Sequence, residues 1–352
     1  MRKKLFTALQ RHYYLLTSLG MFLSFPSFDL WCLKAFPLFA WISLVPLFAS
    51  VRGKPMREVF VSAFITGLAG NLITYQWIGN FGAEVSGGYT VILLFLVPAL
   101  TGFFTAKILV AEYLSRRFER LRMLIYPAAW IGVDWIQSVG HLAFPWTYWG
   151  YSQYPFTALI QLASVTGVMG VTFLVVLGNC ALADLWLAFQ SGERAIGRLA
   201  RSTAFRRAVA LAVAVAVVSG AGWVVMRAAG SASKRDMRVA MVQSCIDPWD
   251  NWTRNRMRFL GELLKYTARA VEHDPDLVIW SESATLEMLS FDFMFGRLNM
   301  FEQRLFESVR GFARPLITGE IGRTDDMINR RAYYHNSAVL IGPDGAPAGE
   351  YR

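Results

Sequence analysis

The sequence has little charge and almost no cysteine. Of its 352 residues, 17% are charged, against about 25% in an average soluble domain. Its three cysteines are too few and too dispersed for a disulfide scaffold or a cysteine-based metal site. Hydrophobic residues make up 55% of the chain, which excludes a disordered protein and disfavours a purely soluble one. We expect a membrane protein, and we predict no metal site and no cofactor.

The net charge of +10 is unevenly distributed along the chain. Residues 1–230 hold 19 Lys and Arg against 8 Asp and Glu, whereas residues 231–352 hold 16 against 17. A nucleic-acid-binding protein would carry its basic residues on a soluble face. Here they lie between hydrophobic segments, where they set membrane orientation, so we predict no nucleic-acid partner.

Seven apolar segments in the first 230 residues are close to the ~20 residues that span a bilayer. They cover approximately residues 12–28, 30–50, 59–79, 90–111, 123–140, 157–189 and 207–229. Pro26, Ser27 and Asp29 separate the first two, which predicts a tight helical hairpin. The chain is therefore expected to begin with a membrane domain of about seven transmembrane helices over residues 1–230.

The loops between these segments alternate in charge. The N-terminus and the second, fourth and sixth loops are rich in Lys and Arg, whereas the loop at 80–89 has only Glu84 and the loop at 141–156 has no charge. The positive-inside rule then predicts a cytoplasmic N-terminus. With seven spans, residues 231–352 lie on the outer side of the membrane.

Residues 231–352 alternate between strand and helix patterns. We expect strands at 237–244, 277–280, 315–320 and 337–341, with helices at about 251–273 and 299–313. This order predicts an α/β domain.

Glu282 lies just past the carboxyl end of the wholly apolar strand Leu277–Trp280. The carboxyl edge of a parallel sheet is where catalytic groups gather. Partial burial beside Trp280 would raise the pKa of the Glu282 carboxyl toward the range useful for a general base. The alternative is that Ser281, Glu282 and Ser283 cap the next helix.

Four runs of this part resemble the first half of a nitrilase (carbon–nitrogen hydrolase) domain: VAMVQS from Val239, DLVIWSESA from Asp276, PLITGEI from Pro315 and YHNSAVLIGPDG from Tyr334. Seven spans and the run FPWTYWGYSQ (144–153) precede them. Together they resemble the apolipoprotein N-acyltransferases, which are membrane-bound members of the nitrilase superfamily. The implied fold is a multi-pass α-helical membrane domain followed by a partial α/β nitrilase-like (α-β-β-α sandwich) domain. The implied location is the bacterial cytoplasmic (inner) membrane.

The resemblance implies a reaction and two substrates. The family moves an acyl chain from a phospholipid to the N-terminal amino group of a diacylglyceryl-Cys apolipoprotein, through a thioester on a Cys nucleophile, with a Glu general base and a Lys that stabilises the tetrahedral intermediate. Glu282 matches the glutamate. The lysine would come next after Arg352, and the nucleophilic Cys and a last transmembrane helix further on, so we expect the sequence to be C-terminally incomplete and inactive alone. Cys245 does not match the nucleophile. The alternative function is a truncated, non-catalytic relative that binds lipid or lipoprotein.

The resemblance also implies substrate-binding positions, each of which has a structural alternative. Trp252 matches a tryptophan near the mouth of the active site, or is a membrane-interface anchor. Asn336 matches a polar position near the pocket, or bonds at a strand edge. Trp146 and Tyr151 would help to line a route for lipid, or belong only to an aromatic belt.

Asp134 lies within the fifth apolar segment, where an acid is costly. We expect it to have a structural partner such as Gln137 or a nearby backbone group.

Overall fold

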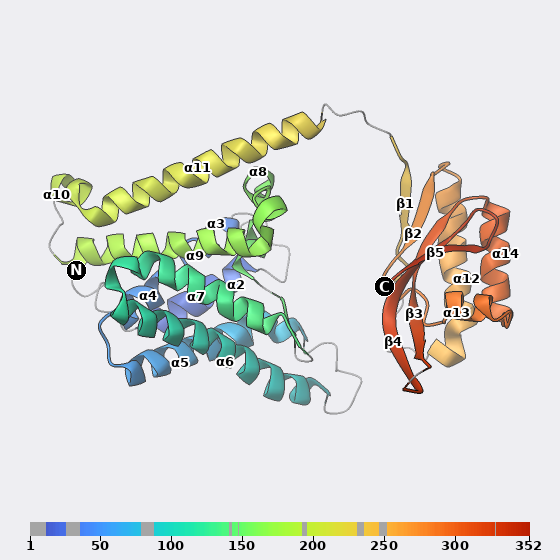
Figure 1. Ribbon diagram of the computed structural model, residues 1–352, viewed down its shortest axis with the longest axis horizontal. Coiled ribbons are helices and arrows are strands. Elements are labelled where there is room, and N and C mark those ends of the chain that lie inside the picture. Colours follow the sequence, from blue (N-terminus) through green and yellow to red (C-terminus); the bar gives the residue numbers. More distant parts are fainter. Residues whose placement is uncertain are drawn as a thin grey trace. The chain divides into compact units, whose positions relative to one another are not determined.

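The computed structural model describes residues 12–25, 36–78, 88–140, 143–146, 148–191, 196–230, 236–245, 252–327 and 329–352. The predicted hairpin turn at Pro26, Ser27 and Asp29 lies outside these residues. The chain divides into two compact units, Met1–Ala232 and Ser233–Arg352 (Figure 1).

The first unit is helical throughout its described part (Figure 1). Its helices are α2 (Tyr13–Ser24), α3 (Phe36–Ala40), α4 (Val45–Val51), α5 (Met56–Tyr75), α6 (Gly88–Arg117), α7 (Arg122–Gln137), α8 (Thr157–Ile160), α9 (Ala163–Gln190), α10 (Ile196–Arg201) and α11 (Thr203–Gly230). Short 3-10 helices cover, among others, Glu119–Leu121 and Trp149–Gln153.

Four helices of the described residues are long and apolar enough to cross a membrane. They cover Met56–Ile78, Leu93–Arg117, Ala163–Gln190 and Thr203–Ala229. Two shorter apolar helices cover Tyr13–Ser24 and Pro37–Val51. The first unit therefore has the helices of a membrane protein, and the count of seven spans stays a prediction.

The centre of the helical unit is a tight apolar cluster. Leu44, Leu47, Phe48, Ile108 and Trp130 are almost fully buried in it. Phe48 meets Trp130 edge to face with their ring centroids 6.2 Å apart, which favours a fixed packing of α4 against α7.

The second unit contains one mixed sheet of five strands in the order β1-β2-β3-β4-β5. The strands are β1 (Val239–Val242), β2 (Leu277–Trp280), β3 (Leu316–Asp326), β4 (Arg331–Ile341) and β5 (Pro347–Tyr351). The first three are parallel, and β3, β4 and β5 pair in antiparallel fashion. The parallel part brings the carboxyl ends of β1 and β2 to one edge, because Val242 pairs with Trp280.

Helices α12 (Trp252–Val271) and α14 (Met300–Phe312) cover one face of this sheet (Figure 1). Both are amphipathic, and their apolar residues join strand residues such as Val278, Leu316 and Val339 in one buried cluster. A short helix, α13 (Leu289–Met294), lies between β2 and α14 in the chain. The sequence did not predict α13, β5 or the polar halves of β3 and β4.

Candidate functional site

The loop after β2 leaves the sheet in a constrained conformation. Ser283 has a φ of +52°, the left-handed region that non-glycine residues rarely adopt. Directly beneath it, a Cβ on Gly319 of β3 would lie 2.6 Å from the backbone nitrogen of Ser283. Thr285 fastens the loop by donating its hydroxyl to the carbonyl of Gly319 at 2.8 Å. The glycine therefore allows the loop that carries Glu282 to rest on β3.

Glu282 and Asn336 are brought together by this loop. The Asn336 side-chain amide on β4 donates to Glu282 Oε1 at 3.4 Å. The helix-cap alternative does not fit, because α13 begins at Leu289 with Met288 as its N-cap. Glu282 is exposed, whereas the sequence led us to expect a partly buried carboxylate. The difference arises because the loop places Glu282 beside the amide of Asn336 rather than in the core around Trp280.

Trp252 is held by a different carboxylate. Its indole Nε1 donates to Glu287 Oε1 at 3.1 Å, and Arg256 reaches the same oxygen at 3.3 Å. The Trp252 ring also packs against Phe259 and Phe301, with ring centroids 5.7 and 5.8 Å away. Glu287 belongs to the loop that carries Glu282, so this loop connects all three predicted site residues of the unit. Sequence reasoning missed Glu287, although it ends the run SATLE directly after Glu282.

A second polar cluster lies on the sheet face that α14 covers. Glu320 of β3 is 3% exposed, and its carboxylate accepts from the backbone and hydroxyl of Ser290 at 2.9 and 2.6 Å. Burial raises the pKa of Glu320. Glu350 of β5 accepts from Ser337 at 2.9 Å and from Arg352 at 2.8 Å, and the hydrogen bond from Arg352 lowers the pKa of Glu350. Glu320 was not predicted as a site residue, although it closes the run PLITGE.

The run FPWTYWGYSQ of the helical unit contains both buried and exposed residues. Gln153 is fully buried, accepts from the Trp41 indole and donates to the carbonyl of Pro37, both at 2.9 Å. The backbone of Gly150 donates to Thr172 Oγ1 at 3.0 Å, and a Cβ on Gly150 would lie 2.7 Å from the carbonyl oxygen of Val168. These residues fasten the run to the helices.

Trp146 and Tyr151 are the exposed aromatic residues that the sequence singled out in this run. They are 45% and 44% exposed. Trp146 stacks on Trp77 with ring centroids 5.3 Å apart, and Tyr151 stacks on Tyr148 at 5.5 Å. The stacking therefore holds both side chains at the surface of the helical unit.

Asp134 has an unpredicted partner. Lys107 of α6 lies 2.5 Å from Asp134 Oδ1 and also donates to Gln137 Oε1 at 3.3 Å. Gln137, the partner expected from the sequence, is thus joined to the pair through the lysine, and its own amide donates to the carbonyl of Phe144 at 2.8 Å. This buried network connects α6 and α7 to the run at 144–153.

The two described cysteines are separate from one another. Cys180 is buried in the helical unit, and Cys245 is exposed just past the end of β1 with a φ of +51°. Cys32 lies outside the described residues. Over the part of the chain that the structure describes, no three His, Cys, Asp or Glu side chains gather into a possible metal site.

Comparison with known proteins accounts for this combination of helices, motif and sheet. Residues 17–181 match the model of the apolipoprotein N-acyltransferase N-terminal domain. The apolipoprotein N-acyltransferase of Geobacter metallireducens is 29% identical over 351 residues, which cover 97% of this chain. The chain is therefore similar to apolipoprotein N-acyltransferases over nearly its whole length. Its long apolar helices fit a membrane protein, as does this similarity.

Two further relatives show the same similarity and its extent. The apolipoprotein N-acyltransferase of Chlorobaculum tepidum is 27% identical over 96% of this chain, and apolipoprotein N-acyltransferase 1 of Treponema denticola is 24% identical over 75%. The matched part makes up 63% of the Geobacter protein, 62% of the Chlorobaculum protein and 47% of the Treponema protein. The chain therefore spans less than two thirds of these relatives.

Proposed function

We propose that this chain provides the membrane domain and the glutamate-bearing part of an enzyme that N-acylates lipoproteins. The acyl donor is a phospholipid, and the acceptor is the N-terminal amino group of a diacylglyceryl-Cys apolipoprotein. The observation that carries the proposal is the placement of Glu282 beside Asn336 at the carboxyl edge of β2, in a chain that matches apolipoprotein N-acyltransferases over 97% of its length.

Glu282 acts as the general base in this proposal. The carboxylate accepts the proton of a Cys thiol, and the thiolate attacks the phospholipid ester. A thioester forms while the ester C–O bond breaks, and the proton passes to the departing lysophospholipid oxygen. The apolipoprotein amine then attacks the thioester, and the carboxylate accepts the proton that the amine loses. The amide C–N bond forms while the C–S bond breaks, and the proton passes from the carboxylate to the departing Cys sulfur. Among residues 1–352, Glu282 is the residue that matches this set.

The described sheet supports a nitrilase-like α-β-β-α sandwich as the fold of the second unit. One face is covered by α12 and α14 (Figure 1). Among the residues on the other face, Val239 and Met241 of β1 are 45% and 85% exposed. A sandwich of this type covers such an apolar face with a second sheet. The face that carries Val239 and Met241 is therefore the one on which we expect the second sheet to pack.

The remaining predicted residues take substrate-binding roles in the proposal. Trp252, fixed by Glu287, and Asn336, bonded to Glu282, position the acceptor and the ester near the base. Trp146 and Tyr151 contact the lipid, because exposed aromatic side chains favour the membrane interface. The charge pattern favours a cytoplasmic N-terminus, with residues 231–352 on the outer side of a bacterial cytoplasmic membrane.

The decisive experiment measures acyl transfer from labelled phospholipid to a lipoprotein acceptor by the whole protein that contains residues 1–352. We expect Glu282→Gln to lower the rate about 10²- to 10⁴-fold, the usual contribution of a general base. Cys245→Ala is the matched control and should retain the parental rate.

Two outcomes would contradict the proposal. Transfer that survives Glu282→Gln removes the general-base role. Transfer abolished by Cys245→Ala moves the nucleophile to the end of β1. Lipid binding by the whole protein without any transfer would instead support the non-catalytic alternative.

A further inference from the structure

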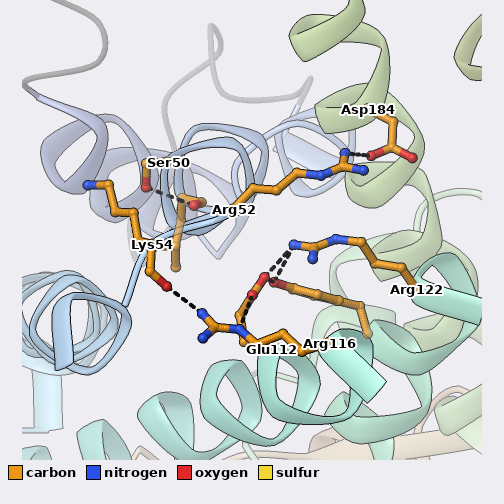
Figure 2. A network of polar contacts seen from close by, with 9 residues as sticks. Ser50, Arg52, Lys54, Glu112, Arg116, Arg122 and Asp184 are labelled. Carbon is orange, nitrogen blue, oxygen red and sulfur yellow. Dashed lines mark hydrogen bonds and ion pairs between the residues drawn. The ribbon is translucent and has the colours of Figure 1, made fainter. Parts of the chain in front are cut away.

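Charged side chains gather where one end of the membrane helices meets the α4–α5 connection (Figure 2). Glu112 of α6, 1% exposed, accepts from Arg122 and Tyr126 of α7. Arg116 donates to the backbone carbonyl of Lys54 in the α4–α5 connection and lies 3.6 Å from Glu112. Every charge of this first group is therefore used to hold α6, α7 and the connection together.

A second group of charged residues lies next to the first, and its arginines keep N–H donors that have no partner among the described residues. Asp184 of α9 pairs with Arg52 of the α4–α5 connection (Figure 2) and with Arg207 of α11 at 3.5 Å. Each guanidinium carries five N–H donors, and within the described residues each makes a single ion pair. Two positive charges share one carboxylate here, so the group has a net positive charge and spare donors.

A cavity opens directly at these two arginines. Its volume is about 620 Å³, and it lies between the end of α9 and the start of α11. Its wall includes both arginines, Asp184, Ser191 directly after α9 and Ala204 of α11. Arginine recognises phosphate through paired N–H donors. The cavity is therefore suited to a phosphate group.

An apolar groove lies along the same two helices, on the residues of α11 that follow Arg207. It has a volume of about 720 Å³, and its wall includes Gly178 and Leu182 of α9, Ala158 of α8, and Ala208, Ala212 and Val215 of α11. Helix α11 also packs tightly on α8, because a Cβ on Gly222 would lie 1.9 Å from the carbonyl oxygen of Ala158. Helix α11 therefore contacts α9 through Arg207 and α8 through Gly222, and the groove lies beside the residues between them.

The length of the groove matches one leaflet of a bilayer. Ser219 is the last α11 residue in its wall, and the helix rises about 18 Å between Arg207 and Ser219. Half of the hydrocarbon core of a bilayer is about 15 Å thick. A lipid whose phosphate contacts Arg207 would therefore have an acyl chain of the right length to fill the groove.

We propose that this cavity and groove bind one anionic phospholipid as a structural ligand, with its phosphate on Arg52 and Arg207 and one acyl chain between α9 and α11. The net positive charge selects against a headgroup that adds an amine, because like charges repel. The lipid fills the groove beside the middle of α11 and so holds this helix against the bundle. Its leaflet is the cytoplasmic one if the proposed orientation holds, whereas the binding itself depends on neither orientation nor acyl transfer.

The test measures lipid retained by the purified, delipidated chain, using native mass spectrometry with phosphatidylglycerol. We expect Arg207→Gln to weaken binding about tenfold, the effect of losing a charge-assisted hydrogen bond. Arg207→Lys should restore part of the affinity. Ala212→Trp should block the groove with a similar loss. The matched controls are Arg206→Gln, which removes a neighbouring charge, and Ala214→Trp, which adds the same ring outside the groove wall.

The outcomes separate the possible occupants. Phosphatidylcholine should bind more weakly than phosphatidylglycerol, and inorganic phosphate should not compete at equal concentration. Equal losses in Arg206→Gln and Arg207→Gln would overturn the site, since they would show only general charge attraction. Competition by inorganic phosphate alone would replace the lipid with a free anion. A dimer that Ala212→Trp dissociates would show that a second copy fills the groove.

Discussion

Lys107 and Asp134 form the ion pair that joins α6 to α7 inside the membrane unit. They are 8% and 1% exposed, and Lys107 also lies over the ring of Trp130 at 5.3 Å from its centroid. Removal of one partner leaves an unpaired buried charge, which costs about 3–5 kcal/mol. We expect Lys107→Met to lower the unfolding free energy by that amount, measured by denaturation of the purified chain in detergent.

The double variant Lys107→Met with Asp134→Asn is the control for this pair. It removes the unpaired charge as well, so it should recover part of the lost stability. If both variants are equally destabilised, the packing of the Lys107 stem, rather than its charge, is what α6 and α7 depend on.

Gly319 is the residue on which the position of Glu282 depends most directly. A Cβ there would lie 2.6 Å from the nitrogen of Ser283, so Gly319→Ala must displace the loop after β2. We expect faster hydrogen exchange in residues 281–290 and a loss of about 1–3 kcal/mol in stability, as for other overpacked sites. Gly349→Ala in β5 is the matched control, because nothing lies within 4 Å of its added Cβ. Equal hydrogen exchange of residues 281–290 in the two variants would contradict the close approach of Gly319 to the backbone of Ser283.

A site residue could be predicted from the sequence where a short continuous segment is enough to indicate its position in the fold. Glu282 stands just past an apolar strand, and this position led to it without any knowledge of Asn336. Lys107 and Glu287 could not be found in this way. Their roles depend on partners 27 and 35 residues away, Asp134 and Trp252, and a single sequence does not tell which elements lie together. The exposure of Glu282 was missed for the same reason, since it follows from the contact between its loop and β3.

At the level of elements, helix α14 contains a titrating group in its cap. Asn299 caps the helix in a capping box with Glu302, which is fully buried. Burial raises the pKa of Glu302 to about 7 from its ordinary 4.5. The folded state therefore binds this proton more tightly than the unfolded state does. The contribution of this protonation to the free energy of unfolding is complete below pH 4.5 and is lost as the pH rises through 7. This contribution reaches at most about 3 kcal/mol.

Hydrogen exchange of the α14 amides tests this pH dependence. After correction for intrinsic rates, we expect less protection at pH 8 than at pH 5.5. Glu302→Gln keeps an acceptor for the capping box but does not titrate, so its protection should be the same at both pH values. A parental chain with flat protection between these values would show that Glu302 is already ionised at pH 5.5.

The sequence predicted the elements that have a strong apolar pattern. It did not predict those that form only through hydrogen bonds to a neighbouring strand. The strands β1 and β2 are short apolar runs, and the helices α12 and α14 have one apolar face. Strand β5 has the sequence PAGEY and is mostly exposed. It is a strand because it hydrogen-bonds to β4, and its residues alone favour a turn. Similarly, a turn at 41–44 precedes α4, which has Pro46 in its first turn, and this turn divides the predicted segment 30–50.

At the scale of the whole molecule, the division of charge agrees with the division into two units. The excess of Lys and Arg belongs to residues 1–230, and the compact units divide after Ala232. The composition separated the two parts because only residues 1–230 have the apolar segments of a membrane domain. The charge pattern also predicts the orientation of the chain in the membrane, which a chemical test can measure.

Cys245 offers that test because it is exposed in the second unit. In a Cys32→Ser background, the described cysteines are Cys245 and Cys180, and Cys180 is buried. We expect a membrane-impermeant maleimide added to intact spheroplasts to label the chain, and Cys245→Ser to abolish the labelling. Arg120→Cys, at the basic end of α6, should be labelled only after the membrane is opened. If Cys245 instead reacts only in opened membranes, the basic loops do not set the orientation, and Glu282 then faces the cytoplasm.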